Sequence, residues 1–148
     1  MECVEILLGW LEKNPDSGEL AEPLGNVANC MGFQNFLYAW NRISIPGSGL
    51  QEMPKYVTNF PEAWMERYRK RAYYRNDHML KLCLVGVLPV IWGKFGHENL
   101  SRKEKRIIKE AATYGLIPGI SIPFHGPRGQ FGLFCLSGNH NLDGNKKN

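Results

Sequence analysis

Four side chains in the middle of the sequence have the types and the spacing of a small-molecule site. They are Trp64, Tyr68, Asp77 and Trp92, the last of which lies in an apolar, strand-like run. Trp64 and Tyr68 are one helical turn apart, and each carries one polar group that needs a partner when the ring is buried. An indole donor, a phenol and a carboxylate within aromatic walls suit a small amphipathic ligand that has an amide and a ring carbonyl.

Each of these residues also has a purely structural interpretation. Phe60, Trp64 and Tyr68 recur at every fourth position, and an aromatic stripe on a helix usually belongs to the core. Asp77 could instead cap a helix or a turn by accepting hydrogen bonds from nearby backbone N–H groups. Taken alone, this group of residues leaves both interpretations open.

The helix that would carry Trp64 and Tyr68 is predicted by the residues that precede it. Asn59 has the residue type of an N-cap, Pro61 suits a first helical turn, and Glu62 completes a capping-box spacing with Asn59. The stripe would therefore lie on a helix that begins near residue 60.

A second capping box, Ser101 with Glu104, predicts a later helix that ends at Gly115. The residues expected to face inward on this helix are Ile107, Ile108, Ala111 and Ala112. Amphipathic patterns over residues 2–13 and 20–31 predict two further helices before the first strand.

Aromatic, β-branched and alternating runs predict five strands. They cover residues 33–42, 54–58, 87–92, 119–125 and 130–137. The last two are joined by Gly-Pro-Arg-Gly and form an evident hairpin. Short loops and this hairpin favour an antiparallel sheet, so we expect the α+β class with an α/β/α arrangement of layers.

The composition narrows the class of protein. At 148 residues the chain is long enough for one domain, and a net charge of +4 is too small to indicate nucleic-acid binding by itself. Basic residues in 67–75 and 102–106 fit solvated helix faces better than a phosphate site. The four cysteines and four histidines lack the spacing of a metal or thioredoxin site. With no signal peptide and no run of about 18–20 apolar residues, we expect a cytoplasmic protein.

The spacing W-x3-Y-x8-D, with a second tryptophan fifteen residues after the aspartate, resembles the autoinducer-binding domain of LuxR-type quorum-sensing regulators. T-N-F-P-E-A-W, L-S-R-K-E and Y-G-L-I-P-G-I-S-I-P-F-H-G-P-R-G-Q-F-G-L-F also resemble this family and occur in the same order. The resemblance implies a five-stranded antiparallel sheet flanked by helices, a PAS- or GAF-like sensor fold. It also implies no cofactor, and a ligand, an N-acyl homoserine lactone, between the sheet and one helical layer.

The resemblance assigns roles to individual positions. Trp64 would donate its indole N–H to the lactone carbonyl, and Asp77 would accept the amide N–H of the ligand. Trp92 would pack on the lactone ring, while Tyr68 would form part of the wall. The complete set of expected ligand-binding residues is Phe60, Trp64, Tyr68, Asp77, Trp92, Ile107, Ala111 and Cys135.

Three positions depart from the family pattern. Phe60 replaces a tyrosine that donates to the acyl carbonyl, Cys135 replaces a serine or threonine, and His78 replaces a proline. Because a thiol is a weak donor, we expect a weaker preference for 3-oxo substituents. The preferred acyl length would depend on how the cavity closes around four further positions. These are Tyr38, Trp40, Ile107 and Leu133.

The expected organisation is an autoinducer-binding domain over residues 1–138 and a polar tail over 139–148, with no helix-turn-helix domain and hence no DNA contact in this chain. A homodimer or a heterodimer with a related regulator is expected. The alternative function is that of a truncated homologue that dimerises with a full-length regulator and inhibits it. An enzyme acting on acyl-lactones is disfavoured because Cys83 lies in an apolar run without an evident base.

Overall fold

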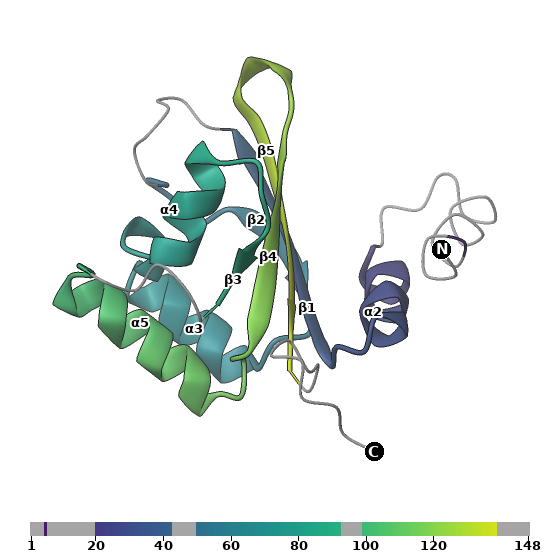
Figure 1. Ribbon diagram of the computed structural model, residues 1–148, viewed down its shortest axis with the longest axis horizontal. Coiled ribbons are helices and arrows are strands. Elements are labelled where there is room, and N and C mark those ends of the chain that lie inside the picture. Colours follow the sequence, from purple (N-terminus) through teal and green to yellow (C-terminus); the bar gives the residue numbers. More distant parts are fainter. Residues whose placement is uncertain (1–4, 6–19, 43–49, 93–98, 139–148) are drawn as a thin grey trace.

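The computed structural model describes Glu5 and residues 20–42, 50–92 and 99–138 (Figure 1). Five strands form one antiparallel sheet in the order β2-β1-β5-β4-β3. The strands are β1 (Asn35–Arg42), β2 (Lys55–Thr58), β3 (Val90–Ile91), β4 (Gly119–His125) and β5 (Gln130–Ser137). The helices are α2 (Ala21–Cys30), α3 (Glu62–Lys70), α4 (His78–Val85) and α5 (Arg102–Thr113), with short 3-10 helices η1 (Tyr73–Arg75) and η2 (Pro127–Gly129).

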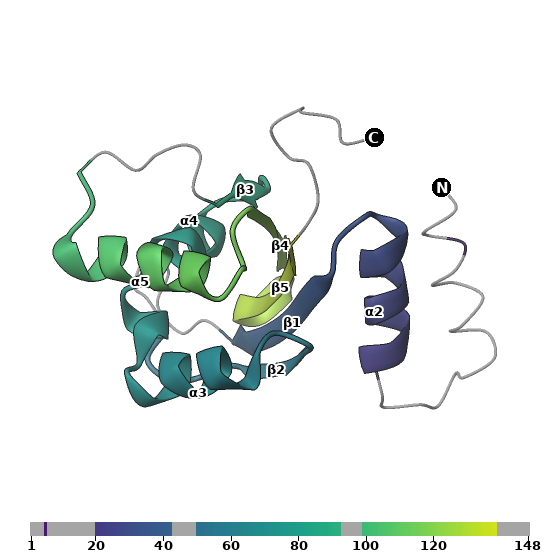
Figure 2. The same cartoon turned by 90° about the horizontal axis from the view of Figure 1, so that it is seen from below.

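Helices cover both faces of the sheet. α2 lies on one face, and α3, α4 and α5 lie on the other (Figures 1 and 2). Because successive strand residues point to opposite faces, Phe36 and Leu136 pack with Ala28 of α2 in a small core. The neighbouring Cys135 instead belongs to the larger core that contains Trp64 of α3. The α+β class and the α/β/α arrangement predicted from the sequence are confirmed.

The predicted strands are present, with one substantial difference in length. β1, β2, β4 and β5 begin and end within two residues of the predicted ranges, but β3 is only Val90–Ile91. The helix predicted over residues 20–31 is α2, whose Pro23 lies in the first turn, where a missing N–H costs little. The helix predicted over residues 2–13 and the tail over 139–148 lie outside the described residues, apart from Glu5.

The predicted N-cap of α3 was wrong, because Asn59 serves the sheet instead. Its Oδ1 accepts the backbone N–H of Phe36 at 2.7 Å, and its Nδ2 donates to the carbonyl of Gln34 at 3.1 Å. Pro61 occupies the N-cap position and makes no side-chain cap. The polar residues before the helix therefore fasten the end of β2 to the start of β1 and fix where α3 begins.

α4 was not among the helices predicted from the sequence, which showed only an apolar run around Cys83. Asp77 is its N-cap, and the side chain accepts hydrogen bonds from the backbone N–H groups of Met79 at 3.1 Å and Leu80 at 3.4 Å. At the other end of the helix, Nε2 of His125 on β4 lies 2.7 Å from the carbonyl oxygen of Gly86. The helix is thus held at both ends by side chains.

α5 begins at the predicted capping box. Ser101 Oγ accepts the N–H of Glu104 at 3.1 Å, and the Glu104 carboxylate accepts the N–H of Ser101 at 2.9 Å. Gly115 follows the last turn with φ of +75°, which glycine adopts without steric cost. Ile107 is buried as expected, but Ala112 is exposed, because the inward stripe of this helix is narrower than four residues.

Candidate functional site

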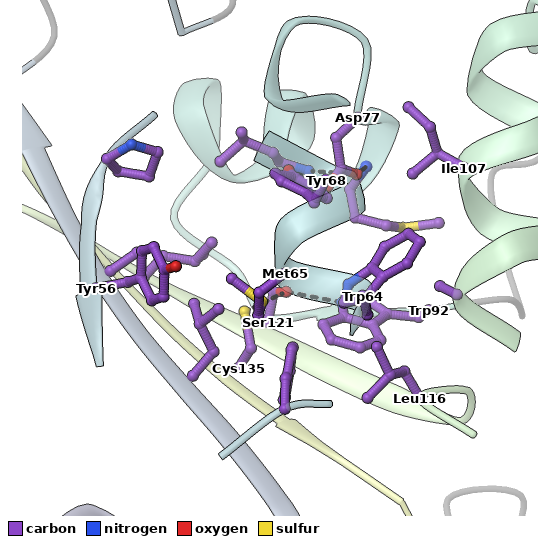
Figure 3. Close-up of a pocket in the computed structure, with 18 of the residues that line it drawn as sticks. Tyr56, Trp64, Met65, Tyr68, Asp77, Trp92, Ile107, Leu116, Ser121 and Cys135 are labelled. Atoms are coloured by element: carbon purple, nitrogen blue, oxygen red, sulfur yellow. Dashed lines mark hydrogen bonds between the residues drawn. The ribbon is translucent and has the colours of Figure 1, made fainter. Parts of the chain in front are cut away.

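A cavity of about 110 Å³ lies between the sheet and the layer formed by α3, α4 and α5 (Figure 3). All eight residues predicted from the sequence to bind ligand line it. This volume is several times the ~10–15 Å³ that one water molecule needs when volume is measured in the same way. The cavity therefore has room for part of an organic ligand. The lining is mostly apolar and aromatic, which is usual for a small-molecule site.

The floor of the cavity is one face of the sheet. The register places Ser121 of β4 opposite Cys135 of β5, and Cys135 opposite Leu37 of β1. Two residues along, Leu133 lies opposite Ala39. The period of two in the strands therefore brings side chains from three strands onto one surface, where a small alanine and a buried serine leave room above the sheet.

Asp77 combines a structural task with a position in the cavity wall. Its Oδ1 caps α4, while its Oδ2 accepts the phenol of Tyr68 at 2.7 Å. The carboxylate therefore has donors without a ligand. A carboxylate offers about four acceptor positions on its two oxygens, so these contacts leave capacity for a further N–H.

Burial changes the proton affinity of this pair. Desolvation raises the pKa of Asp77 above its ordinary value of 3.8, although the hydrogen bonds from Tyr68 and from the backbone of Leu80 oppose the shift. Desolvation and the neighbouring carboxylate raise the pKa of Tyr68 well above 10.0. The phenol is accordingly neutral and donates to Asp77.

Trp64 forms the centre of an aromatic cluster on the helical side. Its ring centroid lies 5.7 Å from that of Tyr68, 5.9 Å from Tyr73 and 5.4 Å from Tyr114. These contacts fix the ring, which is buried and lines the cavity. In the part of the chain that the structure describes, the indole N–H has no hydrogen-bond partner, so it is available to a ligand.

Trp92 is held by the hairpin. Its indole Nε1 donates to Ser121 Oγ at 2.7 Å, and that hydroxyl lies 3.2 Å from Cys135 Sγ. The ring lies directly on the backbone of Gly119, where a Cβ atom would collide with it. An edge-to-face contact with Phe60, at 6.3 Å between centroids, completes its support.

The two cysteines near the cavity are free thiols. Burial raises the pKa of Cys83 to about 12 and that of Cys135 well above its ordinary value, so neither is a thiolate at neutral pH. The two thiols are therefore poor nucleophiles at neutral pH. Within the described ranges, no group of three or more histidine, cysteine, aspartate or glutamate side chains could hold a metal ion.

Polar contacts join α5 to α3 and to the segment that follows α3. Glu110 accepts hydrogen bonds from Arg67 Nε at 2.5 Å and from the Tyr73 phenol at 2.7 Å. The bond from Arg67 lowers the pKa of Glu110. Near the start of α5, Glu104 lies 3.5 Å from Lys81 Nζ of α4. These contacts place the apolar side of α5 over the cavity.

Several residues that line the cavity were not predicted from the sequence. They include Tyr56, Met65, Leu116 and Ser121. The alternation of the predicted hairpin could have placed Ser121 near Cys135, but Tyr56 required the order of the strands. Tyr38, expected to shape the cavity, does not line it: it stacks on Trp40 at 5.5 Å and lines a separate surface groove.

The sequence matches the profile of a family described as autoinducer binding domain over residues 16–146. The chain belongs to this family. Its members are transcriptional regulators with a ligand-binding domain, and not enzymes, as the sequence predicted. The fold is also that of CepR2 from Burkholderia cenocepacia, an N-acylhomoserine lactone dependent LuxR family factor. That match has a TM-score of 0.72 at 23% identity and covers 95% of this chain and 81% of the other.

Curated relatives include transcriptional activator proteins. RaiR of Rhizobium etli is 33% identical over 88 residues, 59% of this chain and 36% of its own length. AnoR of Acinetobacter nosocomialis is 31% identical over 124 residues, 82% and 49% respectively. The chain thus spans half or less of these relatives. SdiA in complex with octanoyl-rac-glycerol has a TM-score of 0.66 at 18% identity, covering 100% of this chain and 58% of the other. None of the described helices is long and apolar enough to cross a membrane.

Proposed function

We propose that this chain is the ligand-sensing domain of a quorum-sensing transcriptional regulator and that it binds an N-acyl homoserine lactone in the cavity. The observation that carries the proposal is that two complementary groups line the same apolar cavity: the Trp64 indole N–H, which has no partner among the described residues, and a carboxylate oxygen of Asp77. One donor and one acceptor match the ring carbonyl and the amide N–H of such a ligand.

The head group would lie between these two residues. Trp64 donates to the lactone carbonyl, and Asp77 accepts the amide N–H while keeping its bonds to Tyr68 and α4. Trp92, oriented by Ser121 and pressed against Gly119, packs on the lactone ring. Because these groups are already held by other contacts, little conformational entropy is lost when the ligand binds.

The acyl chain would lie along the apolar lining. Ile107 and Ala111, one turn apart on α5, form one wall, and Leu133 lies on the opposite floor. Burial of each CH2 group contributes about 0.8 kcal/mol, so the chain supplies most of the affinity and the polar groups select the head.

Two departures from the family pattern bear on the substituent at the third acyl carbon. Phe60 lines the cavity but has no hydroxyl for the acyl carbonyl. Cys135 offers only a thiol, which already lies 3.2 Å from Ser121 Oγ. We therefore expect a weaker preference for 3-oxo ligands than the tyrosine and serine of the family pattern would give.

A second role, dimerisation with a related regulator, is favoured by apolar side chains at the surface. Val85, Val87 and Leu88 around the end of α4 are 67%, 76% and 75% exposed, and Phe124 is 54% exposed. Exposed apolar groups of this kind are typical of protein contacts. If this role is the main one, the chain will lower the DNA-bound fraction of a full-length regulator without any lactone.

The test of the proposed function is a thermal shift of the purified chain with lactones of increasing acyl length. The controls are the ring-opened N-acyl homoserines and octanoyl glycerol. Binding to the folded state raises the melting temperature by mass action. We expect a rise that depends on acyl length and requires the closed ring. No rise with any lactone at saturating concentration, or an equal rise with the ring-opened compounds, would refute the assignment.

A further inference from the structure

A further polar group, far from the head-group site, lines the cavity. Tyr56 lies on β2, opposite Ala39 of β1, and lines the cavity. Figure 3 shows it at the other end of the pocket from Trp92, with its hydroxyl directed inward. Among the described residues, no hydrogen-bond partner exists for this hydroxyl.

The register of the sheet explains the separation. Tyr56 is on the edge strand β2, whereas Ser121 is on β4, and two strands, β1 and β5, lie between them. Three strand spacings of ~4.8 Å place the backbones of Tyr56 and Ser121 roughly 14 Å apart across the sheet. Trp92 follows β3, one strand further away. Tyr56 therefore lies beside the outer part of an acyl chain whose head group is at the other end.

The described residues around Tyr56 provide apolar contacts rather than a partner for its hydroxyl. The cross-strand neighbour Ala39 is buried, and its small side chain leaves the phenol ring room to lie over the sheet. The other lining residues that follow β1 and precede β2 include Leu50 and Met53, which are apolar. Tyr56 is half-buried, and a phenylalanine would make the same packing contacts, so the hydroxyl remains available to a ligand in the cavity.

We propose that Tyr56 is a specificity-determining residue that selects an acyl chain carrying an oxygen near its outer end. The hydroxyl forms a hydrogen bond with that oxygen, inside a part of the cavity that otherwise offers apolar contacts. This inference rests on the proposed function, because the orientation of the ligand follows from the head-group contacts of Trp64 and Asp77.

The experiment compares matched lactones that differ only in one oxygen. The probes are hexanoyl, octanoyl and decanoyl homoserine lactones, the same three with a hydroxyl on the terminal carbon, and 3-hydroxyoctanoyl homoserine lactone. Dissociation constants are measured for the wild type and for Tyr56→Phe. Tyr38→Phe is the matched control, because it removes a phenol from the same sheet outside the cavity.

For at least one chain length, we expect the terminal hydroxyl to improve binding to the wild type by roughly two- to tenfold relative to the plain chain. Tyr56→Phe should abolish this gain, so that the plain and the terminally hydroxylated chains of each length bind the variant equally well, while the ratio between 3-hydroxyoctanoyl and octanoyl homoserine lactone stays as in the wild type. Tyr38→Phe should preserve the gain.

Two results overturn the inference while the proposed function stands: plain lactones bind but no terminal hydroxyl helps, or Tyr56→Phe keeps the gain. If no lactone binds at all, the proposed function fails and this inference fails with it.

Discussion

Replacing Asp77 separates the two tasks of this side chain. In the structure it caps α4 through Oδ1 and accepts the Tyr68 phenol through Oδ2. Asp77→Asn keeps one oxygen, which can cap α4 about as well as aspartate does. It removes the charge and places an NH2 group where Oδ2 accepted the phenol, so the Tyr68 hydroxyl must accept instead of donate. Asp77→Ala removes the cap, the partner of Tyr68 and the charge together.

The magnitudes follow from these contacts. Loss of the cap costs about 0.5–2 kcal/mol, and an unpaired buried phenol costs about 1–3 kcal/mol. Asp77→Ala should therefore lower the free energy of unfolding by about 2–4 kcal/mol. At about 2–4 °C per kcal/mol for a domain of this size, the melting temperature should fall by about 4–16 °C. Asp77→Asn should melt at or above the wild type, because no buried charge is left to desolvate.

The pH dependence of the melting temperature shows whether the charge of Asp77 stabilises or destabilises the fold. Desolvation raises the pKa of Asp77 above 3.8 in the folded state, so folding favours the protonated carboxyl. The stability that this protonation contributes is fully present below pH 3.8 and is lost as the pH rises through the pKa of the folded state. At pH 7 the wild type carries a penalty that Asp77→Asn lacks. The difference in melting temperature between them should narrow as pH falls toward 4. The lowered pKa values of Glu104 and Glu110 destabilise both proteins on acidification and cancel in the difference.

The assay is thermal unfolding from pH 4 to pH 8, without ligand and with a saturating lactone. With ligand, the charged acceptor is worth about 1.5–3 kcal/mol and a neutral one about half of that, so Asp77→Asn should bind roughly tenfold more weakly. A wild type that melts above Asp77→Asn at pH 7 without ligand would show that the carboxylate stabilises the fold, against the desolvation argument. An unchanged melting temperature in Asp77→Ala would refute the roles of the cap and of Tyr68.

Two further substitutions test the support of Trp92 and the wall of the cavity. Gly119→Ala places a Cβ atom in the Trp92 ring. We expect chemical denaturation to show a free energy of unfolding lower by about 1–3 kcal/mol, together with a shifted tryptophan emission spectrum. A stability equal to that of the wild type would mean that the ring can take another position. Phe60→Tyr adds a phenol to the cavity wall and should tighten binding of lactones by roughly two- to tenfold in a competition assay, whereas unchanged affinity would place the acyl carbonyl elsewhere.

The sequence was sufficient for the residues whose positions follow from local spacing. Trp64 and Tyr68 share a helical stripe, and the hairpin alternation places Cys135 on the floor of the cavity. Asp77 was assigned to both a cap and a ligand contact as alternatives, and the structure makes it a cap on the wall of the cavity. The two interpretations were compatible because its two oxygens point to different partners.

What the sequence missed depends on long-range order. α4 is eight residues and mostly apolar, and periodicity cannot distinguish such a run from a buried strand. Asn59 has the type and spacing of an N-cap, but its hydrogen bonds to β1 prevail because Phe36 needs a partner beyond the end of β2. Tyr56 reaches the cavity only because β2 pairs with β1 and places it opposite Ala39.

Ligand binding should stabilise the position of α5 on the sheet. Ile107 is the one buried residue of this helix among those described; it belongs to the core around Trp64 and also lines the cavity. Two ion pairs also hold this helix: Glu110 with Arg67, and Glu104 with Lys81. Partly exposed ion pairs contribute little stability in water. An acyl chain in the cavity would give α5 the apolar contacts that these pairs do not provide, so occupancy and the order of α5 should rise together.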